Sequence, residues 1–206
     1  MLWAARDRDR YLRSADGSGK DELSFKNQYC DCYPEDWSTD GKLIAFSEHT
    51  NKTQYDTWLV GTDGDRKPYP YLQTRFNEAW ARISPDGRWM AYVSDQPGQQ
   101  EIMVESIPAG KGRWQISIEG GDWPEWWRDG KELFFRQGTK IMVVPIRLTE
   151  TSVESGKPQA LFEVPADTRF QVSRDGQRFL IALPVDGAEA ASLLTVDTDW
   201  RVGPTK

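Results

Sequence analysis

The chain has 206 residues, of which 38% are hydrophobic, 28% charged and 12% aromatic, with ten tryptophans. This aromatic content argues against a disordered chain, because disordered segments are poor in aromatic residues. The formal net charge of −6 argues against nucleic acid as the main partner. No run of about 18 apolar residues occurs, and residues 1–10 lack the apolar core of a secretory signal, so neither a membrane-spanning helix nor a signal peptide is predicted.

One pattern recurs four times along the chain: an apolar or aromatic residue, a short polar stretch, Asp-Gly, and then an apolar run. The four copies are Trp37–Phe46, Ile83–Tyr92, Trp126–Phe135 and Val172–Ile181. Their turn residues are Asp40, Gly41, Asp86, Gly87, Asp129, Gly130, Asp175 and Gly176. Successive aspartates are 46, 43 and 46 residues apart. This period falls in the range of about 40–50 residues that is typical of four-stranded propeller blades.

A second series of turns is interleaved with the first at half the period. It consists of Asp16-Gly17, Asp63-Gly64, Ala109-Gly110 and Ser155-Gly156. Asp-Gly between apolar runs is a strong hairpin signal, because glycine adopts the positive φ that such turns require. Two turns in each repeat predict two hairpins, and therefore four antiparallel strands.

The segments between these turns have the composition of strands. Dense apolar runs, typical of strands buried on both faces, follow the first turns at Leu43–Phe46, Trp89–Val93, Leu133–Phe135 and Phe179–Leu183. Third strands are predicted at Thr57–Val60, Glu101–Ile107, Ile141–Ile146 and Leu193–Val196. More polar outer strands, suited to a sheet edge, are predicted at Arg66–Leu72, Arg113–Ile118 and Pro158–Val164. The predicted fold class is therefore an all-β propeller of four-stranded antiparallel blades.

The repeats predict one domain over residues 1–206. Its repeats are approximately 1–34 (partial), 35–78, 79–123, 124–168 and 169–203 (partial). This gives four to five blades, which we expect to form an incomplete arc belonging to the C-terminal part of a longer chain. The alternative is that the N-terminal strands complete the last blade and close a five-bladed ring.

The recurring pattern Trp/Phe-Ser-x-Asp-Gly-x-x-apolar-Ala-Phe/Tyr resembles the WD40-like (PD40) repeat of TolB-type β-propellers, which usually have six blades. Further segments resemble the C-terminal propeller of bacterial receptor-type serine/threonine protein kinases; they are Tyr11–Lys20, Gly64–Gln73, Arg113–Ser117, Gln177–Leu180 and Leu194–Trp200. In that family the kinase precedes the propeller, which is often extracytoplasmic. The chain departs from the pattern at Cys30–Cys32, at the turns without proline, and at Trp126-Trp127.

A search for catalytic and metal-binding motifs finds none. The chain has no kinase glycine loop, Walker A sequence or Gly-x-Ser-x-Gly elbow. Cys30 and Cys32 are interpreted as two incidental thiols, and His49 is the one histidine. We therefore expect no catalytic residue, no metal and no cofactor, and a chain that is not an enzyme.

The sequence leaves two functional hypotheses. The first is a non-catalytic scaffold that binds an unidentified protein or small molecule, as the sensor or interaction part of a bacterial signalling protein. The second is the propeller fragment of a multidomain enzyme, a serine/threonine kinase or a prolyl-peptidase-like hydrolase, whose catalytic domain is absent. Candidate binding residues lie in the loops that lead from one blade to the next. They are Tyr33, Asn77, Asp122 and Thr168.

Overall fold

The computed structural model describes residues 2–6, 9–13, 20, 22–25, 31–173 and 178–182. Throughout this part of the chain the regular secondary structure is β-strand, which confirms the predicted all-β class. No helix able to span a membrane occurs among these residues. The strands are β1 (Leu2–Arg6), β2 (Asp9–Arg13), β3 (Glu22–Phe25), β4 (Asp31–Trp37), β5 (Leu43–Thr50), β6 (Gln54–Gly61), β7 (Tyr69–Leu72), β8 (Glu78–Ile83), β9 (Trp89–Ser94), β10 (Glu101–Ser106), β11 (Arg113–Gln115), β12 (Asp122–Trp126), β13 (Glu132–Gln137), β14 (Lys140–Leu148), β15 (Val153–Ser155), β16 (Gln159–Glu163), β17 (Phe170–Val172) and β18 (Phe179–Ile181).

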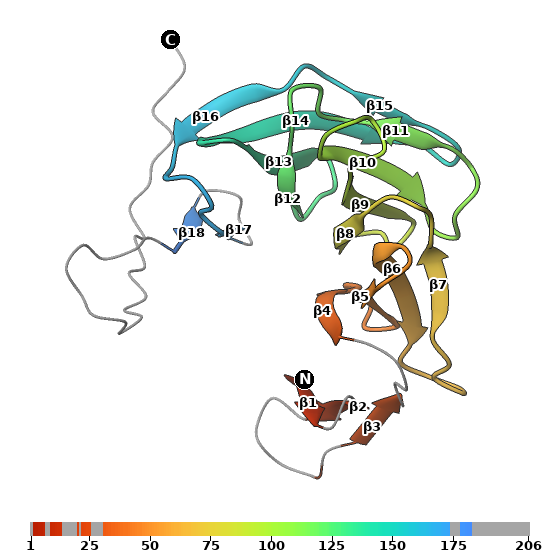
Figure 1. Cartoon of the computed structure of the whole chain (residues 1–206). Coiled ribbons are helices and arrows are strands. Elements are labelled where there is room, and N and C mark those ends of the chain that lie inside the picture. The colour runs from red at the N-terminus through yellow and green to blue at the C-terminus, as the bar shows by residue number, and fades with distance from the viewer. Residues whose placement is uncertain are drawn as a thin grey trace, which may run out of the picture.

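The strands pair in chain order into antiparallel sheets, as expected for propeller blades. Strands β4 to β7 form one four-stranded sheet and β8 to β11 form the next. In the following sheet, β14 pairs with both β15 and β16, so its outer strand is divided into two short pieces. Figure 1 shows these sheets following one another along an arc, with the β1–β3 sheet at one end and the β17–β18 hairpin near the other. This arrangement confirms the prediction of an incomplete propeller of four-stranded antiparallel blades.

The turn between β8 and β9 shows why the repeat carries Ser, Asp and Gly at fixed places. The Ser84 hydroxyl donates to Asp86 Oδ1 at 2.6 Å and accepts the backbone N–H of Trp89 at 3.0 Å. Asp86 Oδ1 also accepts the backbone N–H of Arg88 at 3.1 Å. Gly87 follows with a φ of 74°. The polar residues of the repeat thus satisfy the backbone donors of the turn, and glycine supplies its left-handed residue.

The same turn recurs in the other described copies. Ser38 and Asp40 accept the backbone N–H of Lys42, at 3.1 Å and 3.0 Å respectively. The glycines after the aspartates, Gly41 and Gly130, have φ values of 75° and 71°. Asp175 and Gly176 lie outside the described residues.

Replacing Gly87 with Val is expected to lower the free energy of unfolding by about 1–2 kcal/mol, because a β-branched residue is strained at positive φ. A Cβ added at this position would meet no atom within 4 Å, so the effect isolates backbone strain from steric clash. Urea denaturation checks the value. Gly87→Asn is the control, since asparagine tolerates the left-handed region, and equal losses for both variants would contradict the interpretation.

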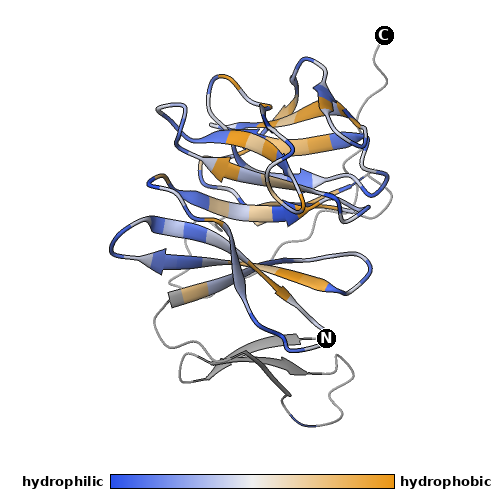
Figure 2. Cartoon of the chain, turned by 90° about the vertical axis from the view of Figure 1, so that its right-hand side faces the viewer, coloured by the Kyte–Doolittle hydropathy of each residue, from blue (hydrophilic) through white to orange (hydrophobic). Residues whose placement is uncertain are grey.

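Each central strand packs apolar side chains against both neighbouring sheets. Along β9, Trp89 and Val93 belong to the cluster shared with β13 and β14, whereas Met90 and Tyr92 belong to the cluster shared with the β4–β7 sheet. This alternation follows from the two-residue period of a strand. Figure 2 shows the apolar colouring mostly along strands. The core is therefore a series of layers between successive blades.

The adjacent residues Trp126 and Trp127 follow the same rule. Trp126 packs against the cluster between the β8–β11 sheet and β13–β14. Trp127 packs against the cluster that joins β13 and β14 to β17 and β18. The pair therefore fills two successive layers of the core, and its two rings do not form one ligand-stacking surface.

Candidate functional site

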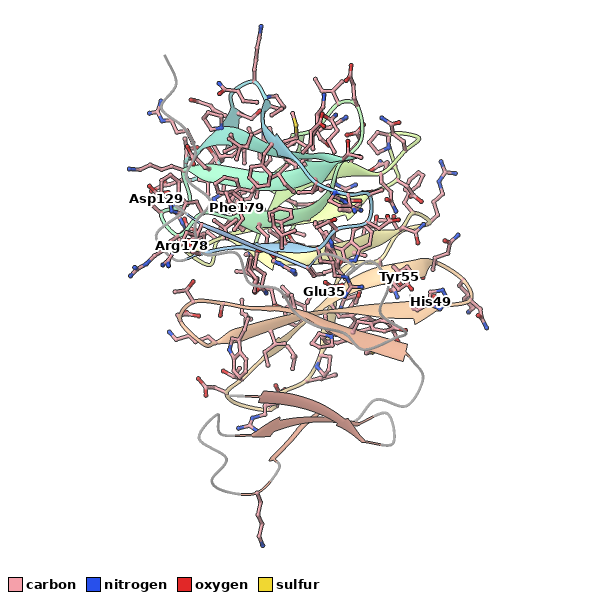
Figure 3. The ribbon with its side chains drawn as sticks, turned by 90° about the vertical axis from the view of Figure 1, so that its left-hand side faces the viewer. Glu35, His49, Tyr55, Asp129, Arg178 and Phe179 are labelled. Atoms are coloured by element: carbon pink, nitrogen blue, oxygen red, sulfur yellow. The ribbon has the colours of Figure 1, made fainter. Side chains whose placement is uncertain are left out.

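A cavity of ≈ 880 Å³ lies at the inner strands, where several sheets converge. Its walls come from β4, β8, β12 and β17, together with the ends of neighbouring strands. Figure 3 shows Glu35 and Tyr55, two of the lining residues, where the β4–β7 sheet faces the next sheet. The side chains that line the cavity and enter the argument below are Tyr33, Glu35, Gln54, Tyr55, Asn77, Trp80, Arg82, Gln100, Trp123, Glu125, Arg169 and Gln171.

A break in strand register occurs in the innermost strand of each complete sheet. The pairing shifts between Pro34 and Asp36 in β4, between Ala79 and Arg82 in β8, and between Asp122 and Glu125 in β12. Trp80 and Trp123 lie within the last two of these breaks and have φ values of 55° and 48°. Such bulges re-aim side chains and are frequent beside functional sites. Here they turn both tryptophans to the cavity.

Equivalent positions of the repeat bring side chains from successive blades to the cavity. Counted from the turn aspartates, the fourth residue upstream is Asp36, Arg82, Glu125 or Gln171. The sixth residue upstream is Pro34, Trp80, Trp123 or Arg169. All of these except Asp36 line the cavity. Two sets of equivalent positions therefore supply part of the site: the fourth residues upstream are polar, and two of the sixth residues upstream are tryptophans.

Within the set of sixth residues upstream, Trp80, Trp123 and Arg169 contact one another in turn. The ring centroids of Trp80 and Trp123 are 5.0 Å apart with an interplanar angle of 52°. The Arg169 guanidinium carbon lies 4.8 Å from the Trp123 centroid, which is a cation–π distance. Three successive blades therefore contribute one wall that is apolar along its length and cationic at its end.

Among the polar residues of the cavity, Arg82 binds both Glu35 and Glu125. Its Nε donates to Glu125 Oε1 at 3.0 Å, and its Nη1 donates to the Glu35 carbonyl at 2.7 Å and lies 3.7 Å from Glu35 Oε2. The Ser47 hydroxyl donates to Glu35 Oε1 at 2.6 Å. The side chains of Glu35, Arg82 and Glu125 are 8%, 17% and 20% exposed, so this network is largely withdrawn from water. It links three blades through one guanidinium.

Burial raises the pKa of Glu35 above its ordinary value, because desolvation outweighs the hydrogen bond from Ser47 and the attraction of Arg82. Burial likewise raises the pKa of Glu125, again against the attraction of Arg82. Burial alone would lower the pKa of Arg82, but the nearby carboxylates outweigh it and raise that pKa. Raised carboxylate pKa values in a cavity are typical of sites that bind ligands or move protons.

Glu35 and Asp40 are expected to change the stability in opposite directions as the pH rises. Glu35 has a raised pKa in the folded state, so stability falls as the pH rises from 4.5 to that pKa. The hydrogen bond from Ser38 lowers the pKa of Asp40, so stability falls as the pH drops below 3.8 toward that pKa. Denaturation of E35Q and D40N across this pH range checks both signs. A loss of stability with rising pH that persists unchanged in E35Q would contradict the assignment.

Two of the four predicted binding residues lie at the cavity. Tyr33 is 50% exposed, with its ring centroid 6.4 Å from that of Tyr55. Asn77 donates its backbone N–H to Asp95 Oδ1 at 3.0 Å and its side-chain amide to Asp95 Oδ2 at 2.6 Å. Its side-chain carbonyl accepts the Tyr55 N–H at 3.3 Å. Asn77 therefore also ties neighbouring sheets together.

The other two predicted binding residues are engaged within the fold and do not line the cavity. Asp122 accepts two hydrogen bonds from Arg136, at 2.7 Å and 2.5 Å. The Thr168 hydroxyl donates to the Pro165 carbonyl at 2.6 Å, and this residue is buried. The structure brings Tyr33 and Asn77 to one site and places these two residues elsewhere.

The residues at the centre of the site were not predicted from the sequence: they are Glu35, Trp80, Arg82, Trp123 and Glu125. A signal was present, because four of them stand at fixed offsets from the turn aspartates. Glu35 does not stand at either of these offsets from its turn aspartate, because it lies within the bulge between Pro34 and Asp36.

The structure also places Cys32 and His49, whereas Cys30 lies outside the described residues. Cys32 is buried and disulfide-bonded, so the interpretation of incidental thiols is wrong for this residue. His49 packs on Tyr55, with ring centroids 4.8 Å apart (Figure 3). Among the described residues, no three His, Cys, Asp or Glu side chains are grouped so as to hold a metal ion.

Antiparallel sheets that follow one another along an arc around a common cavity have the architecture of a β-propeller (Figure 1). No protein-family model and no curated protein matches the chain. Solved structures do match it. TolB from Acinetobacter baumannii is similar at 19% identity and a TM-score of 0.66, over 87% of this chain and 44% of that one. A protein assigned as TolB from Agrobacterium tumefaciens is similar at 21% identity and a TM-score of 0.56, over 76% of this chain and 60% of that one.

Structures with enzyme names also share the fold. A protein assigned as a 6-phosphogluconolactonase from Bacteroides uniformis is similar at 15% identity and a TM-score of 0.53, over 87% of this chain and 62% of that one. The chain thus spans 44–62% of the length of these solved structures. The expectation that the chain is not an enzyme is wrong as an inference from missing motifs, because enzyme names occur among its structural neighbours. At these identities they show the fold alone and leave enzyme status open.

Proposed function

We propose that the chain is a β-propeller domain that binds a peptide segment of a partner protein in the cavity at its inner strands. The observation that carries this proposal is the construction of the cavity from equivalent positions on four sheets. One set of positions supplies the contact between Trp80 and Trp123, and the other supplies the ion pair between Arg82 and Glu125. Pockets that combine an apolar wall with a few fixed polar groups are the usual form of a binding site.

The polar side chains around the opening favour a peptide. Gln54 of β6, Gln100 of the loop between β9 and β10, and Gln171 of β17 border the cavity, and each carries an amide. A side-chain amide donates and accepts hydrogen bonds, as a peptide backbone does, so such groups can pair with an extended segment in several registers. The tyrosines of the rim, Tyr33 and Tyr55, add apolar area with a polar tip.

The likeness of several segments to the propeller of receptor-type kinases supports a place for this domain in a bacterial signalling protein. In that setting residues 1–206 form one domain of four to five repeats, and the domain senses a partner on behalf of a longer chain. The extracytoplasmic position common among the resembled propellers would give the cavity access to external or cell-envelope proteins.

Selection of random peptides on the full chain tests the binding proposal. Peptides enriched on the wild-type chain should lose binding to Tyr33→Ala and to Gln171→Ala, because both residues line the cavity. Tyr69→Ala is the matched control, since Tyr69 is 43% exposed against 50% for Tyr33 and does not line the cavity. Unchanged melting temperatures exclude unfolding as the cause. Peptides that bind Tyr33→Ala and Gln171→Ala as well as the wild type would contradict the proposal.

A second candidate function is hydrolysis in the same cavity. The observation that favours it is Glu125, a carboxylate with a raised pKa that contacts Arg82 at 3.0 Å and lines the cavity. Such a carboxylate suits a general base, with the arginine beside it to stabilise negative charge. The enzyme names among the structural neighbours suggest sugar lactones as substrates. Turnover of 6-phosphogluconolactone or gluconolactone that is lost in Glu125→Gln would support this candidate, and equal turnover in that variant would contradict it.

A further inference from the structure

Two arginines line the cavity, and they differ in their partners. Arg82 is neutralised by Glu35 and Glu125 and is 17% exposed. Arg169 is exposed and rests on Trp123, and among the described residues no carboxylate lies within ion-pair distance of it. The cavity therefore holds one cation whose charge is already matched and one whose charge is not.

The cation–π contact with Trp123 holds the Arg169 guanidinium at the cavity, where it can bind an anion. A guanidinium that lies over an indole face uses its flat surface for that contact and leaves its edge free. The N–H groups along that edge form a fork that matches the two oxygens of a carboxylate. The contact at 4.8 Å also limits the orientations of a long side chain, so less conformational freedom is lost when an anion binds.

The position of Arg169 in the repeat places it on the cavity wall. It occupies the same register position as Pro34, Trp80 and Trp123, which line the cavity from the preceding blades. The two carboxylates of the cavity, Glu35 and Glu125, are held by Arg82. They leave Arg169 as the cationic group available to a ligand.

We propose that the peptide bound by this cavity carries a carboxylate that pairs with Arg169 while an apolar side chain packs beside it on Trp80 and Trp123. This inference rests on the proposed peptide-binding function and specifies the chemistry of the ligand. The carboxylate comes from an acidic side chain or from the C-terminus of the peptide, and both sources present the same group to the guanidinium.

The test uses random peptides selected on the full chain, and then synthetic copies of an enriched peptide in three forms. One form is unchanged, one has its acidic side chains replaced by amides, and one has an amidated C-terminus. Calorimetric titration should show about a tenfold or greater loss of affinity for the form that lacks the contacting carboxylate. The form that loses affinity identifies the source of the carboxylate.

The same titrations on protein variants assign the effect to Arg169. In Arg169→Gln, the unchanged peptide and its carboxylate-free form should bind with equal affinity, whereas Arg169→Lys should retain part of the difference. Arg75→Gln is the matched control, since Arg75 also stacks on an aromatic ring, that of Phe76 at 4.9 Å, and does not line the cavity. This variant should behave as the wild type does.

The possible failures are distinguishable. Enriched peptides that bind in the cavity without a carboxylate would overturn the role of Arg169 and leave peptide binding intact. Equal losses on removing the carboxylate in wild type and in Arg169→Gln would do the same. Failure to enrich any peptide that depends on Tyr33 would overturn peptide binding itself, and the role of Arg169 with it.

Discussion

Replacing Arg82 with Met is expected to lower the free energy of unfolding by about 3–5 kcal/mol, because it leaves two largely buried carboxylates without their cation. Glu35 and Glu125 are 8% and 20% exposed, so water cannot readily replace the guanidinium. The substitution also removes the bond from Arg82 Nη1 to the Glu35 carbonyl, which joins β8 to β4. Urea denaturation at neutral pH measures the loss.

A matched surface pair provides the control. Arg88 pairs with Asp86 at 2.9 Å, but its side chain is 54% exposed, so Arg88→Met should cost less than about 1 kcal/mol. In the Arg82→Met background, replacing Glu35 and Glu125 with Gln should restore part of the stability, because the uncompensated charges are removed. Equal losses for Arg82→Met and Arg88→Met would contradict the account of a buried network.

Replacing Phe135 with Ala is expected to lower the free energy of unfolding by about 3–5 kcal/mol, through lost burial and the cavity left behind. Phe135 is fully buried and belongs to the cluster in which β13 and β14 pack on β9 and β10. Because each blade of a repeat protein is stabilised mainly by its neighbours, the loss should also reduce the cooperativity between these blades. Denaturation followed by near-UV circular dichroism and by hydrogen exchange measures both effects.

Ile118 offers an exposed apolar residue for comparison. It is 75% exposed, so Ile118→Ala should change stability by no more than about 0.5 kcal/mol. A graded series at the buried site, with Phe135→Leu between wild type and Phe135→Ala, separates the cavity effect from a general disturbance. A Phe135→Ala variant as stable as Ile118→Ala would contradict the assignment of the inter-blade core.

The fold was predictable because its determinants are local. The turn at Ser84–Gly87 is satisfied by its own side chains, and its period along the chain gives the number of strands in a blade. The apolar run at Trp89–Val93 was expected to be buried on both faces, and it packs against both neighbouring sheets. No contact with a distant segment is needed to predict any of these features.

The site was harder to predict because its residues act through partners in other blades. Nothing in the local sequence distinguishes Arg82 from the other arginines. Its role depends on contacts with Glu35 and Glu125, each more than 40 residues away. Asp122 looked available for a ligand, but Arg136 holds it with two hydrogen bonds. The bulges at Trp80 and Trp123 could not be recognised in the sequence, although both tryptophans stand at the same offset from a turn aspartate.

Because several blades line the cavity, ligand binding is expected to change the rigidity of the propeller. A ligand that contacts β4, β8, β12 and β17 at once would connect sheets whose core clusters otherwise join only successive sheets. Binding would then make the arc more rigid with little displacement of any strand. It would be detected as slower amide exchange and slower proteolysis across the whole arc. A domain attached at either end would then be connected to a more rigid propeller when the ligand is bound.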